Sequence, residues 1–188
     1  MFGVMKKLLM ARQIKFEEGR IVLFGQRIFM IPTYSYITLQ LKLEESGLAH
    51  LIYHSTKDLG KQWTLDLQKN YKTNHKYVVD WGINIVNLAG YGVAETVKDD
   101  PENNHSAFRL KDSATAEYVL KALKKKSEYP VCHLFRGMIT GTFSVLYKTD
   151  LDGIETKCKA MGYPHCEFIL KPKKEFDLTD KQIKRQLG

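Results

Sequence analysis

The sequence predicts an α+β fold in which an antiparallel β-sheet packs against a layer of helices. Segments that alternate polar and apolar residues occur in adjacent pairs, and each pair is joined by a short polar turn. Runs with helical periodicity separate these pairs. A doubly wound parallel sheet would instead alternate strands and helices one for one, so the order of segments favours antiparallel pairing.

The composition is that of a folded domain with a core of its own. Hydrophobic residues make up 44% of the 188 residues and charged residues 27%, a balance that separates the chain from disordered proteins. No apolar run approaches the roughly 20 residues of a membrane-spanning helix. Residues 1–13 are too short and too charged for a signal peptide. We therefore expect a cytoplasmic protein with no membrane span.

The net charge of +8 permits attraction to nucleic acid, but the placement of the basic residues argues against it. The densest basic stretches, residues 120–126 and 170–176, do not interleave lysines with the aromatic platforms that bind single strands. We expect these lysines to form a solvated face, and nucleic acid is not an expected partner.

The first segments predict a small β-unit followed by a helix. Residues 13–32 alternate polar and apolar side chains and break near Gly19 and Gly25, which indicates a hairpin or a small meander. A helix should open at Thr33, and Gly47 should end it.

The middle of the chain predicts two further helices and a strand pair. A helix is expected over residues 48–71, with Gly60 as a point of close packing. Another should cover residues 75–89. The segments 90–100 and 106–113 should then pair as antiparallel strands. The inward stripe of the first helix is predicted to contain Leu48, Leu51, Ile52, Leu59, Trp63 and Leu67, and that of the second Val78, Trp81, Ile85 and Leu88.

The last third predicts two helices and a closing hairpin. Ser113 is expected to cap an amphipathic helix that follows it. The next helical stretch carries Gly137 and Gly141 four residues apart, and such small residues permit close packing. Two strands, over residues 153–161 and 165–172, should form the final hairpin.

The chain is expected to form a single globular unit with three parts. Residues 1–32 form an N-terminal β-hairpin segment, residues 33–172 the main domain, and residues 173–188 a charged C-terminal tail. The tail is expected to be a short peripheral helix or a frayed end.

All three thiols fall in the last third of the chain, at Cys132, Cys158 and Cys166. An odd count without an export signal argues against a disulfide framework, because thiols stay reduced in the cytosol. Folding back at the hairpin turn can bring the last two cysteines together. Zinc takes four ligands from thiolate, imidazole and carboxylate groups, so three thiols need one more ligand.

The candidates for the fourth ligand are Glu155, His133 and His165. In a regular strand Glu155 and Cys158 point to opposite faces, so joint ligation requires a bulge or a turn at residues 156–157. Spacing alone leaves two other interpretations open. The cysteines can serve as small buried hydrophobes, or the two cysteines of the hairpin can form a disulfide.

The region from Val131 to Leu170 resembles the vinyl-4-reductase (V4R) domain family, and the resemblance continues more weakly back to Tyr53. It contains a cysteine, a glycine-bearing helix, Glu-x-x-Cys and then Cys-x-Phe in the order typical of that family. The resemblance implies a fold similar to subunits of the TRAPP vesicle-tethering complex and to the sensory domain of phenol-responsive regulators, with an apolar cavity and commonly as a dimer. It also implies a zinc site at Cys132, Glu155, Cys158 and Cys166. Four protein ligands leave no open position for water, so such a zinc would be structural.

The sequence offers no catalytic constellation. It contains no dinucleotide fingerprint, no Walker loop and no nucleophile elbow. His54 and Asp58, one helical turn apart, are expected to make only a local contact.

By analogy with the family we expect a pocket for an apolar small molecule, although the same side chains would also fill an ordinary core. The expected function is that of a zinc-containing domain that binds an apolar or hydrocarbon-like small molecule in a sensory or regulatory role. The alternatives are a scaffold subunit that acts through protein assembly and an accessory subunit of a reductase. The expected wall residues are Trp81, Ile85, Phe108, Phe135, Ile139 and Phe143.

Overall fold

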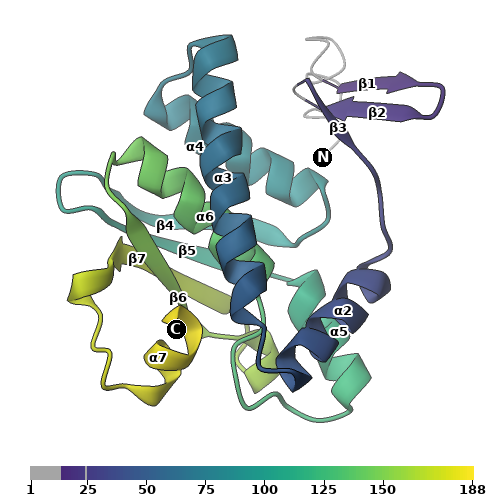
Figure 1. The fold of residues 1–188 in the computed structure, drawn as a ribbon, viewed down its shortest axis with the longest axis vertical. Helices are drawn as coiled ribbons and strands as arrows, with labels where there is room; N and C mark the ends of the chain where they lie inside the picture. The colour runs from purple at the N-terminus through teal and green to yellow at the C-terminus, as the bar shows by residue number, and fades with distance from the viewer. Residues whose placement is uncertain (1–13, 24) are drawn as a thin grey trace.

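A four-stranded antiparallel sheet is the platform on which the helices pack (Figure 1). The structure is a computed structural model that describes residues 14–23 and 25–188. The expectation that residues 1–13 form no signal peptide therefore lies outside the described residues. The strands run in the order β4-β5-β7-β6, and all neighbours are antiparallel, as predicted. They are β4 (Val93–Asp100), β5 (His105–Lys111), β6 (Leu151–Lys157) and β7 (Cys166–Pro172).

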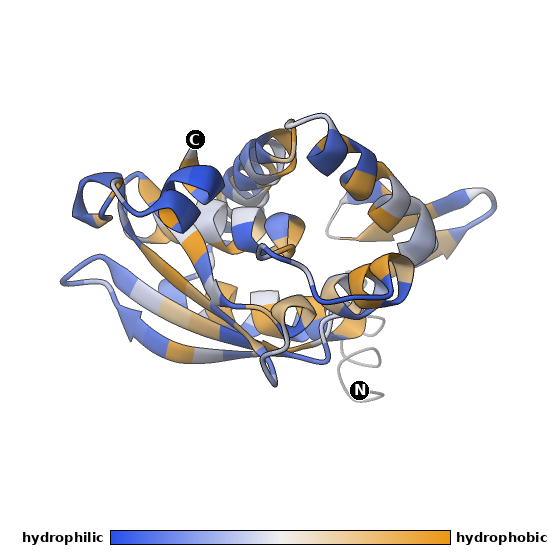
Figure 2. Ribbon diagram, turned by 90° about the horizontal axis from the view of Figure 1, so that it is seen from below, coloured by the Kyte–Doolittle hydropathy of each residue, from blue (hydrophilic) through white to orange (hydrophobic). Residues whose placement is uncertain are grey.

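The helices form the second part of the predicted α+β class, and α6 lies between α3 and the sheet (Figure 1, Figure 2). Caps that the sequence indicates fix the first turns, since the Ser113 side chain accepts a hydrogen bond from the backbone N–H of Ala116. None of the helices formed by the described residues is long and apolar enough to cross a bilayer. They are α2 (Thr33–Glu45), α3 (His50–Tyr71), α4 (His75–Leu88), α5 (Ala114–Leu123), α6 (His133–Leu146) and α7 (Lys181–Leu187).

A separate three-stranded meander precedes the helices, in agreement with the predicted β-unit. Gly19 and Gly25 adopt φ angles of 67° and 79°, a left-handed region that glycine enters without strain and that suits the turns between strands. The predicted first residue of the unit, Gln13, lies outside the described residues. The strands are β1 (Ile14–Glu17), β2 (Arg20–Leu23) and β3 (Gln26–Ile28).

Glycines allow α3 and α6 to pack with their backbones in close contact. A Cβ atom at Gly141 would collide with the carbonyl oxygen of Lys57, and one at Gly60 with the carbonyl oxygen of Met138. A methyl group at Gly137 would meet the carbonyl oxygen of Tyr53. The predicted close packing at these glycines is confirmed.

The predicted inward stripe of this helix is wrong at three of its leucines. Leu48, which lies before the start of α3, and Leu51 and Leu59 are 42%, 48% and 50% exposed. The residues Tyr53, Gly60 and Thr64 of α3 are buried instead. The face of α3 that contacts α6 is selected by small residues that permit close approach, and this turns the larger leucines outward. A count of apolar residues at helical spacing does not include glycine or threonine, so it assigned the wrong face.

The first strand of the final hairpin is shorter than predicted. β6 ends at Lys157, and the remainder of the expected strand forms a 3-10 turn, Lys159–Met161. A register shift between Glu155 and Lys157 ends the regular pairing. The turn then closes at Gly162, whose φ angle is 100°. The predicted pairing of the two strands is itself confirmed.

We predict opposite outcomes for one substitution at two helical glycines. Gly141→Ala should lower the free energy of unfolding by about 2 kcal/mol or more, because the new methyl group meets backbone atoms that cannot rotate away. Gly82→Ala in α4 meets no atom within 4 Å and should raise stability by up to about 1 kcal/mol through helix propensity. Urea denaturation measures both. Equal stability of the two variants would contradict the close contact between α3 and α6.

Candidate metal centre

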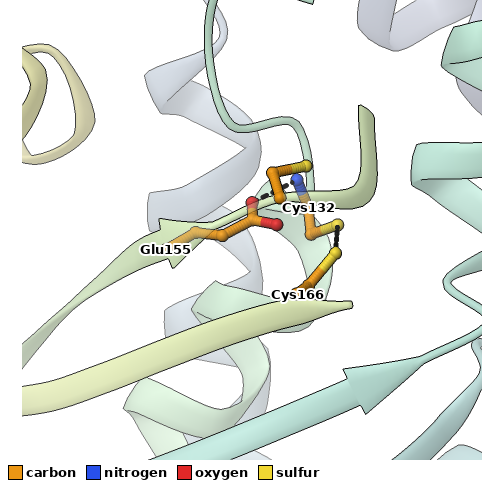
Figure 3. A group of neighbouring side chains, drawn as sticks. Cys132, Glu155 and Cys166 are labelled. Carbon is orange, nitrogen blue, oxygen red and sulfur yellow. Dashed lines mark hydrogen bonds between the residues drawn. The ribbon is translucent and has the colours of Figure 1, made fainter. Parts of the chain in front are cut away.

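Four potential metal ligands from three segments meet at the N-terminal end of α6. Cys132 is the residue directly before α6, Glu155 lies in β6, Cys158 follows β6, and Cys166 begins β7. One ligand atom of each residue lies within 4.8 Å of the others. All four residues are at most 2% exposed. Figure 3 shows the side chains of Cys132, Glu155 and Cys166 directed toward one another.

A bulge in β6 brings Glu155 and Cys158 to the same centre. The register of β6 against β7 shifts between Glu155 and Lys157, and a shift of this kind changes the face to which the following side chains point. The sequence indicated that joint ligation would require a bulge or a turn at residues 156–157, and the register shift is an irregularity of that kind. Beyond the bulge, the backbone N–H of Lys159 donates a hydrogen bond to Cys166 Sγ at 3.4 Å.

The distance between the sulfur atoms of Cys132 and Cys166 suits two ligands of one metal ion and is too long for a disulfide bond. Cys132 Sγ and Cys166 Sγ are 3.6 Å apart, close to the edge of about 3.8 Å that a tetrahedron with metal–sulfur bonds of about 2.3 Å requires. A disulfide bond is only about 2.05 Å long. All three cysteines are free, so the disulfide considered between Cys158 and Cys166 is not formed.

One oxygen of the Glu155 carboxylate accepts a hydrogen bond, and the other has no hydrogen-bond partner among the described residues. Its Oε2 accepts a hydrogen bond from the backbone N–H of Cys132 at 2.9 Å. Its Oε1 is buried and has no hydrogen-bond partner. Folded proteins rarely leave a buried carboxylate oxygen in this condition, because desolvation without a partner is costly. A metal ion at the centre of the cluster would satisfy this atom.

The four acidic groups of the cluster shift the pKa values of one another. Burial raises the pKa of the Glu155 carboxyl well above its usual value. Hydrogen bonds with Cys158 and Cys166 raise the pKa of the Cys132 thiol, while hydrogen bonds from Cys132 and Cys166 lower the pKa of the Cys158 thiol. Because the four acidic groups lie close together, most of them retain their protons when no cation is bound. A divalent cation stabilises the deprotonated form of every ligand at once.

A buried guanidinium group lies beside the cluster. Arg136, on the first turn of α6, is 1% exposed and donates from Nη1 to the carbonyl oxygens of Gly153 and Gln186, at 2.6 and 3.0 Å. Its guanidinium carbon lies 3.8 Å from the centroid of the Tyr53 ring. Three thiolates and a carboxylate around a divalent ion would leave excess negative charge, and Arg136 with the positive end of the α6 dipole would offset part of it.

The two histidines considered as a fourth ligand have other partners. His133 Nε2 lies 2.6 Å from Glu44 Oε1, and His165 Nε2 lies 2.7 Å from Glu167 Oε1. The ligand atoms that the described residues bring together include Glu155 and neither imidazole. Of the three candidates left open by spacing, the geometry selects the glutamate.

The six residues expected to line an apolar pocket fall into two clusters. Phe108, Phe135, Ile139 and Phe143 belong to the main core between the sheet and α6. Trp81 and Ile85 pack instead around Leu67, next to the N-terminal meander. Among the first four, the rings of Phe108 and Phe143 are 4.9 Å apart at their centroids.

Two surface hollows occur elsewhere. One, of about 560 Å³, lies between α2 and α3 and contains both His54 and Asp58, together with apolar residues such as Leu39 and Leu51. The other, of about 280 Å³, is bounded by α2, α5 and residues 125–131. None of the six expected wall residues lines either hollow.

Two residues at the site were not predicted from the sequence. Arg136 could have been found, because it is a charged residue on the inward face of an otherwise apolar helix. Gln186 is 5% exposed and bonds to the main chain of Glu155. It lies in the segment expected to be peripheral, and no local pattern marks it.

Comparison with known families confirms the resemblance over the part of the chain that carries the cluster. The model of the V4R domain matches residues 115–172, which include all four cluster residues. An uncharacterized protein of Methanocaldococcus jannaschii, MJ0150, is 26% identical over 125 residues. That alignment covers 66% of this chain and 65% of the relative, so the chain spans just under two thirds of the relative's length.

Solved structures show a similar fold. The phenol-responsive sensory domain of the transcription activator PoxR, in complex with phenol, has a TM-score of 0.79 and 21% identity, over 95% of this chain and 94% of that one. A vinyl-4-reductase family protein from Methanocaldococcus jannaschii has a TM-score of 0.50 and 16% identity, over 77% and 83% of the two chains. The neighbours also include a trafficking protein particle complex subunit 3 from Naegleria fowleri, covalently bound to palmitic acid, at 0.49 and 10%, over 75% and 90%.

Proposed function

We propose that this chain is a zinc-containing domain that binds an apolar, hydrocarbon-like small molecule in a sensory or regulatory role in the cytoplasm. The convergence of four ligand atoms within 4.8 Å in a buried site carries the metal part of the proposal. The match to the V4R domain and the likeness in fold to a phenol-sensing domain support the small-molecule part.

Zinc is the ion that this donor set suits best. Calcium and magnesium require oxygen ligands, whereas three thiolates with one carboxylate match the borderline-soft character and tetrahedral preference of zinc. Four protein ligands close the coordination shell, so the ion would supply no activated water. It would fasten the β6–β7 hairpin to the start of α6 and add its binding free energy to folding.

A ligand site between the sheet and α6 would lie beside this zinc clip. Phe135 is on the first turn of α6, three residues after Cys132, and its ring centroid is 5.0 Å from that of Phe168 on β7. Phe143 and Phe108 continue the same apolar layer. A small apolar molecule inserted here would act directly on the helix that begins at a zinc ligand.

A second candidate role, assembly with another chain, is favoured by exposed apolar side chains before and along α2. Phe29 and Met30 are 81% and 78% exposed, and Tyr34 is 68% exposed. Leu39 and Leu51 are also exposed and line the hollow between α2 and α3. An accumulation of large exposed apolar side chains is often found at protein–protein interfaces. We propose that a second copy of this chain covers it, which gives a homodimer.

The zinc proposal predicts about one zinc ion per chain in protein purified without added metal. Cys158→Ser should lose the metal and melt at a clearly lower temperature, because the hairpin is then no longer fastened to α6. His165→Ala should keep both the metal and the stability, since His165 bonds to Glu167 outside the cluster. Metal analysis and thermal denaturation measure the outcome. Metal-free wild-type protein would refute the proposal.

The ligand proposal predicts that phenol or toluene raises the melting temperature of the wild-type protein, because binding to the folded state alone stabilises it. Ile139→Phe should abolish this shift by filling the layer beside Phe143, at a cost of about 1–3 kcal/mol in stability. Ile169→Phe is the matched control, because Ile169 is 38% exposed and the shift should persist. No shift with either probe, together with no apolar molecule in native mass spectra of gently purified protein, would favour the assembly role.

The homodimer proposal predicts that the wild-type chain elutes as a dimer, with its mass measured by light scattering. The double variant Phe29→Ser, Met30→Ser should elute as a monomer, because it removes two large exposed apolar side chains. Leu178→Ser changes an apolar residue that is 44% exposed on the approach to α7 and should leave the dimer intact. A monomeric wild-type protein would contradict the proposal.

A further inference from the structure

The side-chain amide of Gln186 on α7 forms hydrogen bonds with both the backbone N–H and the backbone carbonyl group of Glu155, a proposed metal ligand. Gln186 Oε1 accepts a hydrogen bond from the backbone N–H of Glu155 at 2.8 Å. Gln186 Nε2 donates to the carbonyl oxygen of Glu155 at 3.1 Å. This is the pair of bonds that a neighbouring strand would make. Because β6 is an edge strand of the sheet, the amide of Gln186 takes the place of that strand at one residue.

The main chain of Gln186 is tied to the same region. Its carbonyl oxygen accepts a hydrogen bond from Arg136 Nη1 at 3.0 Å, and Arg136 lies one turn after Cys132 on α6. Leu187, the next residue, is 2% exposed and packs with Ile154, which precedes Glu155. The end of α7 therefore contacts β6 and α6 close to two of the four proposed ligands.

Arg185 attaches α7 to a second point beside the cluster. Its guanidinium group lies 3.3 Å from Glu44 Oε2 and stacks 3.5 Å above the ring of Tyr129. The other oxygen of Glu44 bonds to His133, the residue that follows Cys132. Arg185 and Gln186 thus reach the residues next to Cys132 and the main chain of Glu155, respectively.

The helix that carries these residues is too short to be stable on its own. α7 has seven residues, and an isolated helix of that length does not form in water. Asp180 caps it by accepting hydrogen bonds from the backbone N–H groups of Gln182 and Ile183, which fixes only its start. Its helical state therefore depends on docking against β6 and α6.

We infer that Gln186 is a positioning residue for the metal ligand Glu155, and that α7 is a latch whose docking and the occupancy of the metal site stabilise each other. This inference rests on the proposed zinc site. The backbone N–H of Cys132 holds Oε2 of the Glu155 carboxylate, and Oε1 has no hydrogen-bond partner among the described residues. The backbone at Glu155, which Gln186 holds, therefore contributes directly to the direction of the carboxylate. Coupling of this kind is reciprocal, so loss of the ion loosens α7.

The test compares two glutamine-to-leucine variants on the same helix. Gln186→Leu removes both bonds to Glu155 while roughly keeping the side-chain volume, and it should weaken zinc affinity about 10- to 100-fold, the usual effect of losing a partner that orients a ligand. Gln182→Leu is the control, because Gln182 is exposed and its affinity should match that of the wild type. Competition with a chromophoric chelator measures affinity. The visible spectrum of the cobalt-substituted protein should change only in Gln186→Leu, since it reports ligand geometry.

A third variant covers the case in which Gln186→Leu fails to fold. Arg185→Ala loosens α7 at an exposed contact without touching Glu155, and it should weaken zinc affinity about 5-fold. Unchanged affinity and an unchanged cobalt spectrum in the folded variants would overturn the inference while the zinc site stands. A wild-type protein that binds no zinc would overturn the zinc site first, so the two failures are distinguishable.

Discussion

The rest of the structure depends on one constraint, which is that three thiols and one carboxyl group converge in a buried site. Burying such groups without a compensating charge is unfavourable, and the orphaned Oε1 atom of Glu155 shows that hydrogen bonds within the chain do not complete the arrangement. The fold nonetheless brings these groups together from α6, β6 and β7, with a bulge where a regular strand would turn one of them away. The proposed divalent cation would supply the missing interaction and would join segments that are far apart in sequence, which is where a crosslink restricts the unfolded chain most.

Helix α6 links this centre to the remainder of the molecule. Its N-terminal end follows Cys132, one face meets α3 through Gly137 and Gly141, and another carries phenylalanines toward the sheet. Because the two helical backbones touch at the glycines, α6 cannot shift alone, and any displacement is shared by α3. A molecule inserted between α6 and the sheet would therefore act on the start of α6 and on the outer surface of α3 at the same time. A pair of helices locked in this way is a suitable element for transmitting the presence of a ligand.

The order and type of the elements could be predicted from the sequence because each is specified locally. Ser113 marks a helix start, Gly47 marks a helix end, and polar turns separate the alternating strands. The bulge at residues 156–157 was indicated only as a condition, because joint ligation by Glu155 and Cys158 would require a bulge or a turn there. The inward face of α3 could not, because it is chosen by the glycines of a helix some 80 residues later in the chain. The role of Gln186 depends on a tertiary contact with an edge strand, for which the neighbouring residues give no signal.

Glu44 connects the latch helix α7 to α2, which lies in the N-terminal part of the chain. Burial works to raise the pKa of this carboxyl, but hydrogen bonds and charge interactions with His133 and Arg185 outweigh it and lower the pKa below the usual value, so Glu44 stays ionised at neutral pH. One carboxylate thus bridges α2, the start of α6 and α7. Since α2 is also the helix that follows the exposed Phe29 and Met30, a partner that repositions α2 changes the geometry available to both His133 and Arg185. Assembly, docking of α7 and the proposed metal centre would then be coupled through the half-buried carboxylate of Glu44.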